Sequence, residues 1–228
     1  MPFPAAVRCA IFDLDGTLLD SLEDLADSAN AVLGGRGFPP HETSRYRHFV
    51  GDGARTLIQR ILPEAIRNDT ALVQTCLDEY VREYEARWNR KTRPYDGIPE
   101  LLRELASRGI ALAVLSNKPH HFTEKCVQTL CPAPAGSEWA AIVGFQDGLP
   151  LKPDPMGVLE ILKALRIAPS ETLYFGDTST DMKTAVAAGV YPIGALWGFR
   201  SREELEQSGA NLLLAHPCDL LPLLPKHV

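Results

Sequence analysis

Short apolar runs alternate with helical patterns over most of this chain, and this alternation restricts the possible folds more than any other feature. Six runs of four to six residues are almost wholly apolar, at residues 7–12, 110–115, 140–143, 172–175, 191–196 and 212–215. Helical patterns accompany the later runs, at residues 98–107, 119–130, 155–165, 179–188 and 202–207. Continuous apolar runs of this length are typical of parallel strands covered on both faces. The sequence therefore predicts an α/β fold with a Rossmann-like, doubly wound parallel sheet.

Local signals at helix ends support this pattern. Asp154 is a candidate N-cap, and Pro155 would then occupy the first helical position. Gly189 stands where the helix over residues 179–188 is expected to end, because glycine tolerates the left-handed conformation of a helix C-terminus.

The interval from residue 20 to about residue 90 breaks the alternation. Three stretches have apolar residues at helical spacing, and these are Leu22, Leu25, Ala29 and Leu33, then Leu57, Ile61 and Leu62, then Leu77, Tyr80, Val81 and Tyr84. About 70 residues of helix is too long for a simple crossover between strands. We therefore expect a core domain of residues 1–19 and 92–228 and an inserted, small, all-helical domain of residues 20–91.

The charge and cysteine content of the chain restrict the partners and the cellular location that we expect for it. The net charge of −6 offers no basic footprint for nucleic acid or an anionic membrane. Five cysteines without a C-x-x-C pair indicate reduced thiols rather than a disulfide framework or a zinc site. No stretch has the ~18 apolar residues of a membrane helix, and no signal peptide is visible. We expect a cytoplasmic protein, monomeric or homodimeric, without nucleic-acid or membrane partners.

Four polar loops are expected to share one edge of the sheet, at residues 13–17, 116–118, 152–155 and 176–181. Ligands of open parallel sheets bind outside the carboxyl ends of the strands, where such loops converge. The candidate site residues in these loops are four carboxylates, two hydroxyls and one well-placed lysine, and these are Asp13, Asp15, Asp177, Asp181, Thr17, Ser116 and Lys152.

The chemistry of these side chains points to a metal-dependent reaction. Clustered carboxylates repel one another unless a cation neutralises them. Every ligand on offer is oxygen, which favours Mg²⁺ over zinc or copper. One carboxylate can act as a nucleophile, and a second can protonate a leaving oxygen and later activate water.

These motifs resemble those of the haloacid dehalogenase superfamily, in its phosphatase branch, over nearly the whole chain. The segment Asp13-Leu14-Asp15-Gly16-Thr17, then Ser116, Lys152 and the Asp177–Asp181 pair appear in the order of that superfamily. The helical insert is similar to the smaller type of mobile cap in the superfamily.

The resemblance implies a role for each position. Asp13 would be the nucleophile and a metal ligand, and Asp15 the general acid/base, with its backbone carbonyl on the metal. Asp177 would bind Mg²⁺, and Asp181 would bind it or orient its waters. The positions implied to bind phosphate or substrate are Thr17, which would also position Asp15, Ser116, Asn117, Lys152, Gly53 and Arg55.

A closer likeness is to the phosphoglycolate phosphatase-like subgroup. The matching segments are Asp20-Ser21-Leu22-Glu23-Asp24-Leu25, Val50-Gly51-Asp52-Gly53-Ala54-Arg55, Ser116-Asn117-Lys118-Pro119 and Trp197-Gly198-Phe199. The resemblance implies a Mg²⁺-dependent phosphatase that hydrolyses a small phosphomonoester through an aspartyl phosphate, with 2-phosphoglycolate as the expected substrate.

Other functions and plainer interpretations stay open from sequence alone. A sugar phosphomutase or a pyrophosphatase would use the same aspartates. A phospho-accepting receiver module is disfavoured, because it lacks a helical insert of this length. Asn117 can equally serve to support its loop, and Lys118 can equally be a solvated surface lysine.

Overall fold

The computed structural model describes residues 2–224, and its centre is a six-stranded sheet with the order β5-β4-β1-β6-β7-β8. Every neighbouring pair of strands is parallel. The strands are β1 (Cys9–Phe12), β4 (Ala111–Pro119), β5 (Trp139–Phe145), β6 (Thr172–Gly176), β7 (Tyr191–Ala195) and β8 (Leu212–Leu214). All six predicted strands and the doubly wound α/β fold are confirmed.

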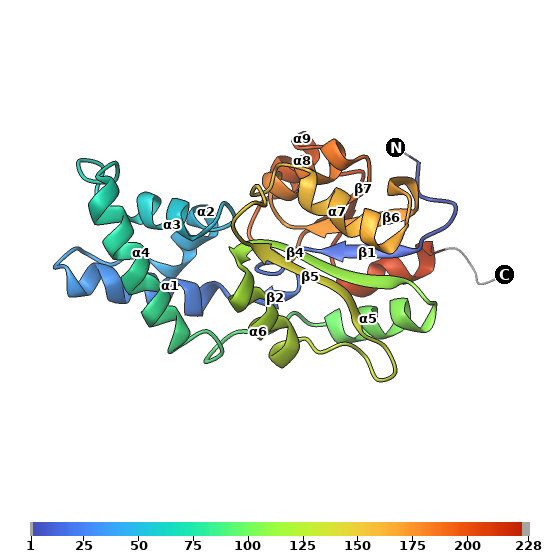
Figure 1. Cartoon of the computed structure of the whole chain (residues 1–228), viewed down its shortest axis with the longest axis horizontal. Coiled ribbons are helices and arrows are strands. Elements are labelled where there is room, and N and C mark those ends of the chain that lie inside the picture. Colours follow the sequence, from blue (N-terminus) through green and yellow to red (C-terminus); the bar gives the residue numbers. More distant parts are fainter. Residues whose placement is uncertain (1, 225–228) are drawn as a thin grey trace.

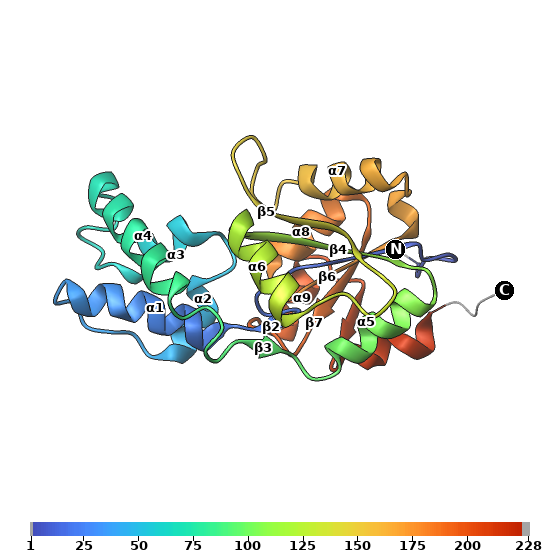
Figure 2. The same ribbon diagram turned by 60° about the horizontal axis from the view of Figure 1, so that its bottom comes forward.

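Helices cover both faces of this sheet (Figures 1 and 2). On one face lie α5 (Ile98–Ser107) and α6 (His120–Leu130), and on the other α7 (Met156–Leu165) and α8 (Ser179–Ala188). The connection between β7 and β8 contains the short helix α9 (Arg202–Gln207). Each face buries its own apolar cluster, which explains why the strands are apolar on both sides.

Two helix-end predictions have different outcomes. Gly189 caps α8 with a φ of 71°, as expected. The predicted N-cap of α7 is wrong by one residue: the helix begins after Pro155, and Asp154 Oδ1 accepts a hydrogen bond from Met156 N at 2.9 Å. The carboxylate therefore still satisfies a free N–H group at the helix start, from one position further back.

Strand β1 lies at the switch point of the sheet. The chain leaves β1 and builds β4 and β5 on one side, then crosses over and builds β6, β7 and β8 on the other side. Loops that follow β1 and its two neighbours therefore diverge above the carboxyl end of β1 and leave a crevice there.

Residues between β1 and α5 form a separate group of helices beside the carboxyl ends of the strands (Figure 1). This helical insert, residues 20–91, contains α1 (Leu22–Gly35), α2 (Tyr46–Phe49), α3 (Ala54–Ile61) and α4 (Thr70–Glu85). A small antiparallel pair, β2 (Leu19–Asp20) and β3 (Arg93–Pro94), joins the outgoing and returning chain. The helical content of the insert is as expected, while its assignment as a domain of residues 20–91 stays a prediction. The predicted core domain, residues 1–19 and 92–228, includes residues 1 and 225–228, which lie outside the described residues.

The cysteines behave as predicted. All five are unpaired, and four of them are buried, while Cys218 is partly exposed. Within residues 2–224, no helix combines the length and apolar character that crossing a membrane requires.

Asp24 links the first helix of the insert to the segment where the insert ends. Its buried carboxylate Oδ2 accepts hydrogen bonds from Lys91 N at 2.9 Å, Thr92 N at 2.8 Å and Thr92 Oγ1 at 2.7 Å. The first turn of α1 is thereby tied to the chain that returns to the core.

We expect Asp24→Ala to lower the free energy of unfolding by roughly 3 kcal/mol, because it leaves buried donors of Thr92 unpaired. The matched control is Asp27→Ala on the same helix, whose exposed carboxylate pairs with Lys91 Nζ. An exposed pair of this kind contributes less than about 1 kcal/mol. Urea denaturation measures both variants, and equal losses would contradict the anchoring role of Asp24.

Candidate active site

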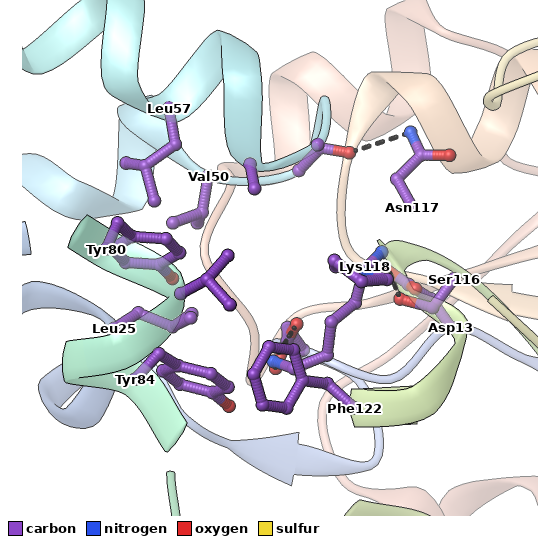
Figure 3. Close-up of a pocket in the computed structure, with 16 residues that line it drawn as sticks. Asp13, Leu25, Val50, Leu57, Tyr80, Tyr84, Ser116, Asn117, Lys118 and Phe122 are labelled. Carbon is purple, nitrogen blue, oxygen red and sulfur yellow. Dashed lines mark hydrogen bonds and ion pairs between the residues drawn. The ribbon is translucent and has the colours of Figure 1, made fainter. Parts of the chain in front are cut away.

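Most of the predicted site residues of the core meet at the carboxyl ends of β1, β4 and β6, beside the helical insert. Asp13 directly follows β1, and its backbone N–H donates to Phe175 O of β6 at 2.9 Å. Ser116 stands within β4, which continues to Pro119 and so runs further than predicted. Figure 3 shows Asp13 and Ser116 side by side on the core side of a cavity.

A buried ammonium group lies at the centre of the site. Lys152 Nζ is 2.8 Å from Asp13 Oδ1 and 2.7 Å from Asp181 Oδ1, and all three side chains are at most 7% exposed. Burial and, second, the charge of Asp181 raise the pKa of Asp13 to about 7, although Lys152 opposes the shift. Burial alone would lower the pKa of Lys152, but the two carboxylates raise it well above its ordinary value. The lysine is therefore a fixed positive charge.

Asp181 is held on both of its oxygens. Besides Lys152, Oδ1 accepts from Tyr174 Oη at 3.3 Å, and Oδ2 accepts from the backbone N–H and the hydroxyl of Thr178 at 3.1 and 2.7 Å. These bonds fix the carboxylate at the start of α8. The hydroxyl of Thr178 in turn accepts a hydrogen bond from Asp181 N at 3.4 Å.

Asp177 is held just as firmly. Its Oδ1 accepts from Thr17 Oγ1 at 3.0 Å and its Oδ2 from Phe199 N at 2.8 Å. Burial, followed by the charges of Asp181 and Asp13, raises the pKa of Asp177 well above its ordinary value. Gly16 passes so close that an added Cβ would lie 2.3 Å from Oδ2, and its φ of +86° also favours glycine. Thr17, predicted to bind phosphate or substrate, is fully buried and places its hydroxyl on Asp177 rather than in the cavity.

Three carboxylates fit a hard cation. Asp13, Asp177 and Asp181 each place one oxygen so that all three atoms lie within 4.8 Å of one another. One lysine cannot balance three buried negative charges. Burial first, and then the repulsion between these carboxylates, raises the pKa of Asp13 and of Asp177. Oxygen donors of this kind suit Mg²⁺. The role of the Asp15 carbonyl as a further ligand stays a prediction.

Asp15 points its carboxylate at a second buried lysine. Lys118 Nζ donates to both oxygens of Asp15 at 2.8 Å, and Ser21 Oγ donates to Oδ1 at 2.6 Å. The sequence allows Lys118 to be a solvated surface lysine, whereas in the structure it is only 8% exposed. A signal was present: side chains two apart on a strand point the same way, so Ser116 predicts the direction of Lys118.

Asn117 connects the loops. Its amide nitrogen donates to Gly51 O of the insert at 3.1 Å (Figure 3). The same nitrogen donates to Lys152 O at 3.1 Å, and Oδ1 accepts from Lys152 N at 2.8 Å. This side chain therefore fixes the backbone of the central lysine and contacts the insert at the same time.

The insert and the core enclose a cavity. The cavity has room for a few water molecules. From the insert, the lining residues are Leu25, Val50, Gly51, Gly53, Ala54, Leu57, Tyr80, Val81 and Tyr84. Of the two predicted insert contacts, Gly53 lines the cavity, whereas Arg55 is exposed and hydrogen-bonds Gln74.

Magnesium should stabilise the fold through the carboxylate cluster. We expect the melting temperature to rise with Mg²⁺, by an amount equivalent to about 2.7 kcal/mol at one hundred times the Kd. Asp177→Asn should lose most of this rise, and Asp147→Asn, which changes an exposed loop acid, should keep it. Thermal denaturation with and without Mg²⁺ measures the effect, and a full response in Asp177→Asn would contradict the assigned metal site.

Comparison with known proteins agrees with this geometry. Residues 10–195 match the family described as haloacid dehalogenase-like hydrolase. A phosphoglycolate phosphatase of Pseudomonas putida is 33% identical over 228 residues, covering 98% of this chain and 81% of the relative. N-acetylmuramic acid 6-phosphate phosphatase of Pseudomonas aeruginosa is 31% identical, covering 96% of each chain.

A solved structure shows the same architecture. A crystal structure from Lactobacillus delbrueckii subsp. bulgaricus, named as a candidate phosphoglycolate phosphatase, superposes with a TM-score of 0.87 at 27% identity. The match covers 97% of this chain and all of that one. The resemblance seen in the motifs is confirmed, and this chain belongs to the haloacid dehalogenase-like hydrolase family.

Proposed function

We propose that this protein is a Mg²⁺-dependent phosphatase that hydrolyses 2-phosphoglycolate through a phosphoryl group carried on Asp13. The observation that carries the proposal is the position of Asp13: its carboxylate touches Lys152 and shares a cation-sized cluster with Asp177 and Asp181. Asp15 follows two residues later at the edge of the same cavity. Membership in the hydrolase family supports this assignment.

The first half of the reaction transfers the phosphoryl group to the protein. A carboxylate oxygen of Asp13 attacks phosphorus, and the bond between phosphorus and the ester oxygen breaks. Asp15 gives a proton to that oxygen, so the alcohol leaves neutral. Lys152 and Ser116 contact the phosphoryl oxygens, and the fixed ammonium stabilises the charge that builds on them.

The second half returns Asp13 to its starting state. Asp15, now a carboxylate, accepts a proton from water, and the water oxygen attacks phosphorus. Phosphate leaves, and the carboxylate of Asp13 is free again. Mg²⁺, held by Asp13, Asp177 and Asp181, would neutralise charge on the phosphoryl oxygens in both halves.

The helical insert would act as a cap that excludes bulk water. Direct contacts with the core support this role. Thr180 Oγ1 donates to Asp52 Oδ1 at 2.7 Å, and Arg47 Nη1 donates to Gly198 O at 3.0 Å. Arg200 Nη2 donates to Val50 O at 3.1 Å. These bonds hold the insert against the core beside the cavity.

The size of the cavity favours a small leaving group. The cavity has room for a few water-sized groups, which suits the few atoms of glycolate. The named activity of the Pseudomonas putida relative supports the same substrate. N-acetylmuramic acid 6-phosphate is a second candidate, because a relative of nearly equal length is named for it. Its leaving group is a full sugar, which needs a more open insert.

A panel of phosphate esters separates these substrates. We expect kcat/KM to be highest for 2-phosphoglycolate and lower for N-acetylmuramic acid 6-phosphate, pyrophosphate and hexose phosphates. Asp13→Asn should lower kcat on 2-phosphoglycolate at least ~1000-fold, as expected when a nucleophile is lost, and Asp147→Asn should match the wild type. Another preferred substrate would contradict the glycolate assignment, and an unchanged rate in Asp13→Asn would contradict the nucleophile.

A further inference from the structure

Lys118 gives the cavity a positive charge that the reaction on phosphorus does not use. Among residues 2–224, it is the only cationic residue in the cavity lining, because Lys152 faces the carboxylate cluster instead. The insert side of the same cavity supplies aliphatic side chains, glycines and two tyrosines. Within this lining, Lys118 is therefore the residue that could select a leaving group by its negative charge.

The ammonium of Lys118 retains capacity to bind a ligand. It has three N–H donors, and the acceptors recorded for it among the described residues are the two oxygens of Asp15. The group also lies 4.6 Å from the ring centre of Tyr84, whose face attracts the positive charge without accepting a strong hydrogen bond. Figure 3 shows Lys118, Tyr84 and Phe122 grouped at one end of the cavity.

The opposite wall, which comes from the insert, is mostly apolar. Leu25, Val50 and Leu57 face the cavity from the insert (Figure 3). The hydroxyl of Tyr84 is already 4.0 Å from Cys126 Sγ. Among the described residues, Lys118 is therefore the one cationic partner in this lining for an anion on the leaving group, and burial of a charge without a partner costs several kcal/mol.

Distances limit where that anion can be attached. Asp15 must reach the ester oxygen with a hydrogen bond of about 2.8 Å, and Lys118 Nζ lies 2.8 Å beyond the Asp15 oxygens. The ammonium is thus within about 6 Å of the ester oxygen. A carboxylate on the carbon next to that oxygen spans this gap with one further hydrogen bond. A neutral leaving group makes no hydrogen bond with the Lys118 ammonium. A leaving group whose anion is several bonds away from the ester oxygen places that anion against the apolar side chains of the insert.

We propose that Lys118 is a specificity residue that binds the carboxylate of the leaving group and so selects phosphate esters of short 2-hydroxy acids. This inference rests on the proposed phosphatase function and narrows it to a substrate class. Glycolate is the smallest member of the class, and the limited volume of the cavity disfavours members with large side chains.

The test compares two esters that differ only in the carboxylate. Each has two carbons: 2-phosphoglycolate carries the carboxylate, and ethyl phosphate carries a methyl group in its place. Lys118→Met should lower the ratio of kcat/KM for 2-phosphoglycolate over ethyl phosphate on the order of 100-fold, the usual loss for a charged hydrogen bond. Both rates come from one preparation, so incomplete folding of the variant cancels in the ratio.

Two further variants complete the design. Lys118→Arg keeps a positive charge at the site and should restore at least part of the ratio. Lys125→Met removes an exposed lysine that also lies over an aromatic ring, that of Trp88, and should leave the ratio within about 3-fold of the wild type, as an exposed group contributes little.

The outcomes separate this inference from the proposed function. A wild-type preference for 2-phosphoglycolate that collapses in Lys118→Met supports the inference. Equal losses on both esters would show that Lys118 acts only through Asp15 and would overturn it while leaving the phosphatase assignment intact. Absence of hydrolysis of either ester by the wild type would overturn the proposed function and the inference together.

Discussion

The contact of Lys152 with Asp13 and Asp181 is the interaction on which the rest of the site depends. Three charges are buried together, and such a group is stable only when its geometry is tight and its remaining hydrogen bonds are satisfied. The surroundings meet this demand: Asn117 holds the backbone of Lys152, and Thr178 holds Asp181. The remaining excess of negative charge, increased further by Asp177, makes the site selective for a cation and for a phosphoryl group beside it.

The sheet and the helical insert divide the work of the protein. The carboxyl ends of β1, β4 and β6 bring the reacting groups together on short, rigid segments, which suits chemistry that tolerates little displacement. The insert contributes apolar side chains over the leaving group and almost no polar ones. Lys118 connects the two parts, because it belongs to β4 and lies against Tyr84 of the insert. The reacting groups and the apolar wall of the cavity thus come from different segments of the chain.

The sequence predicts the fold closely, because apolar runs covered on both faces have few alternatives to parallel strands. It also predicts which loops converge, since strand ends fix their location. It does not predict partners that depend on side-chain direction over long separations: Lys118 meets Asp15 across 103 positions, and Thr17 meets Asp177 across 160. The two-residue strands β2 and β3 carry no periodic signal at all. Arg55 belonged to a motif segment, yet its helix turns it to solvent.

Trapping the phosphorylated enzyme tests the central claim most directly. Asp15→Asn should still accept the phosphoryl group, at a reduced rate, but hydrolyse it slowly, because no base activates the water. We predict that rapid acid quenching with 2-phosphoglycolate and Mg²⁺, followed by peptide mass spectrometry, finds the phosphoryl group on Asp13. A quenched enzyme that turns over substrate without any label on Asp13, or with the label on another residue, would contradict the account.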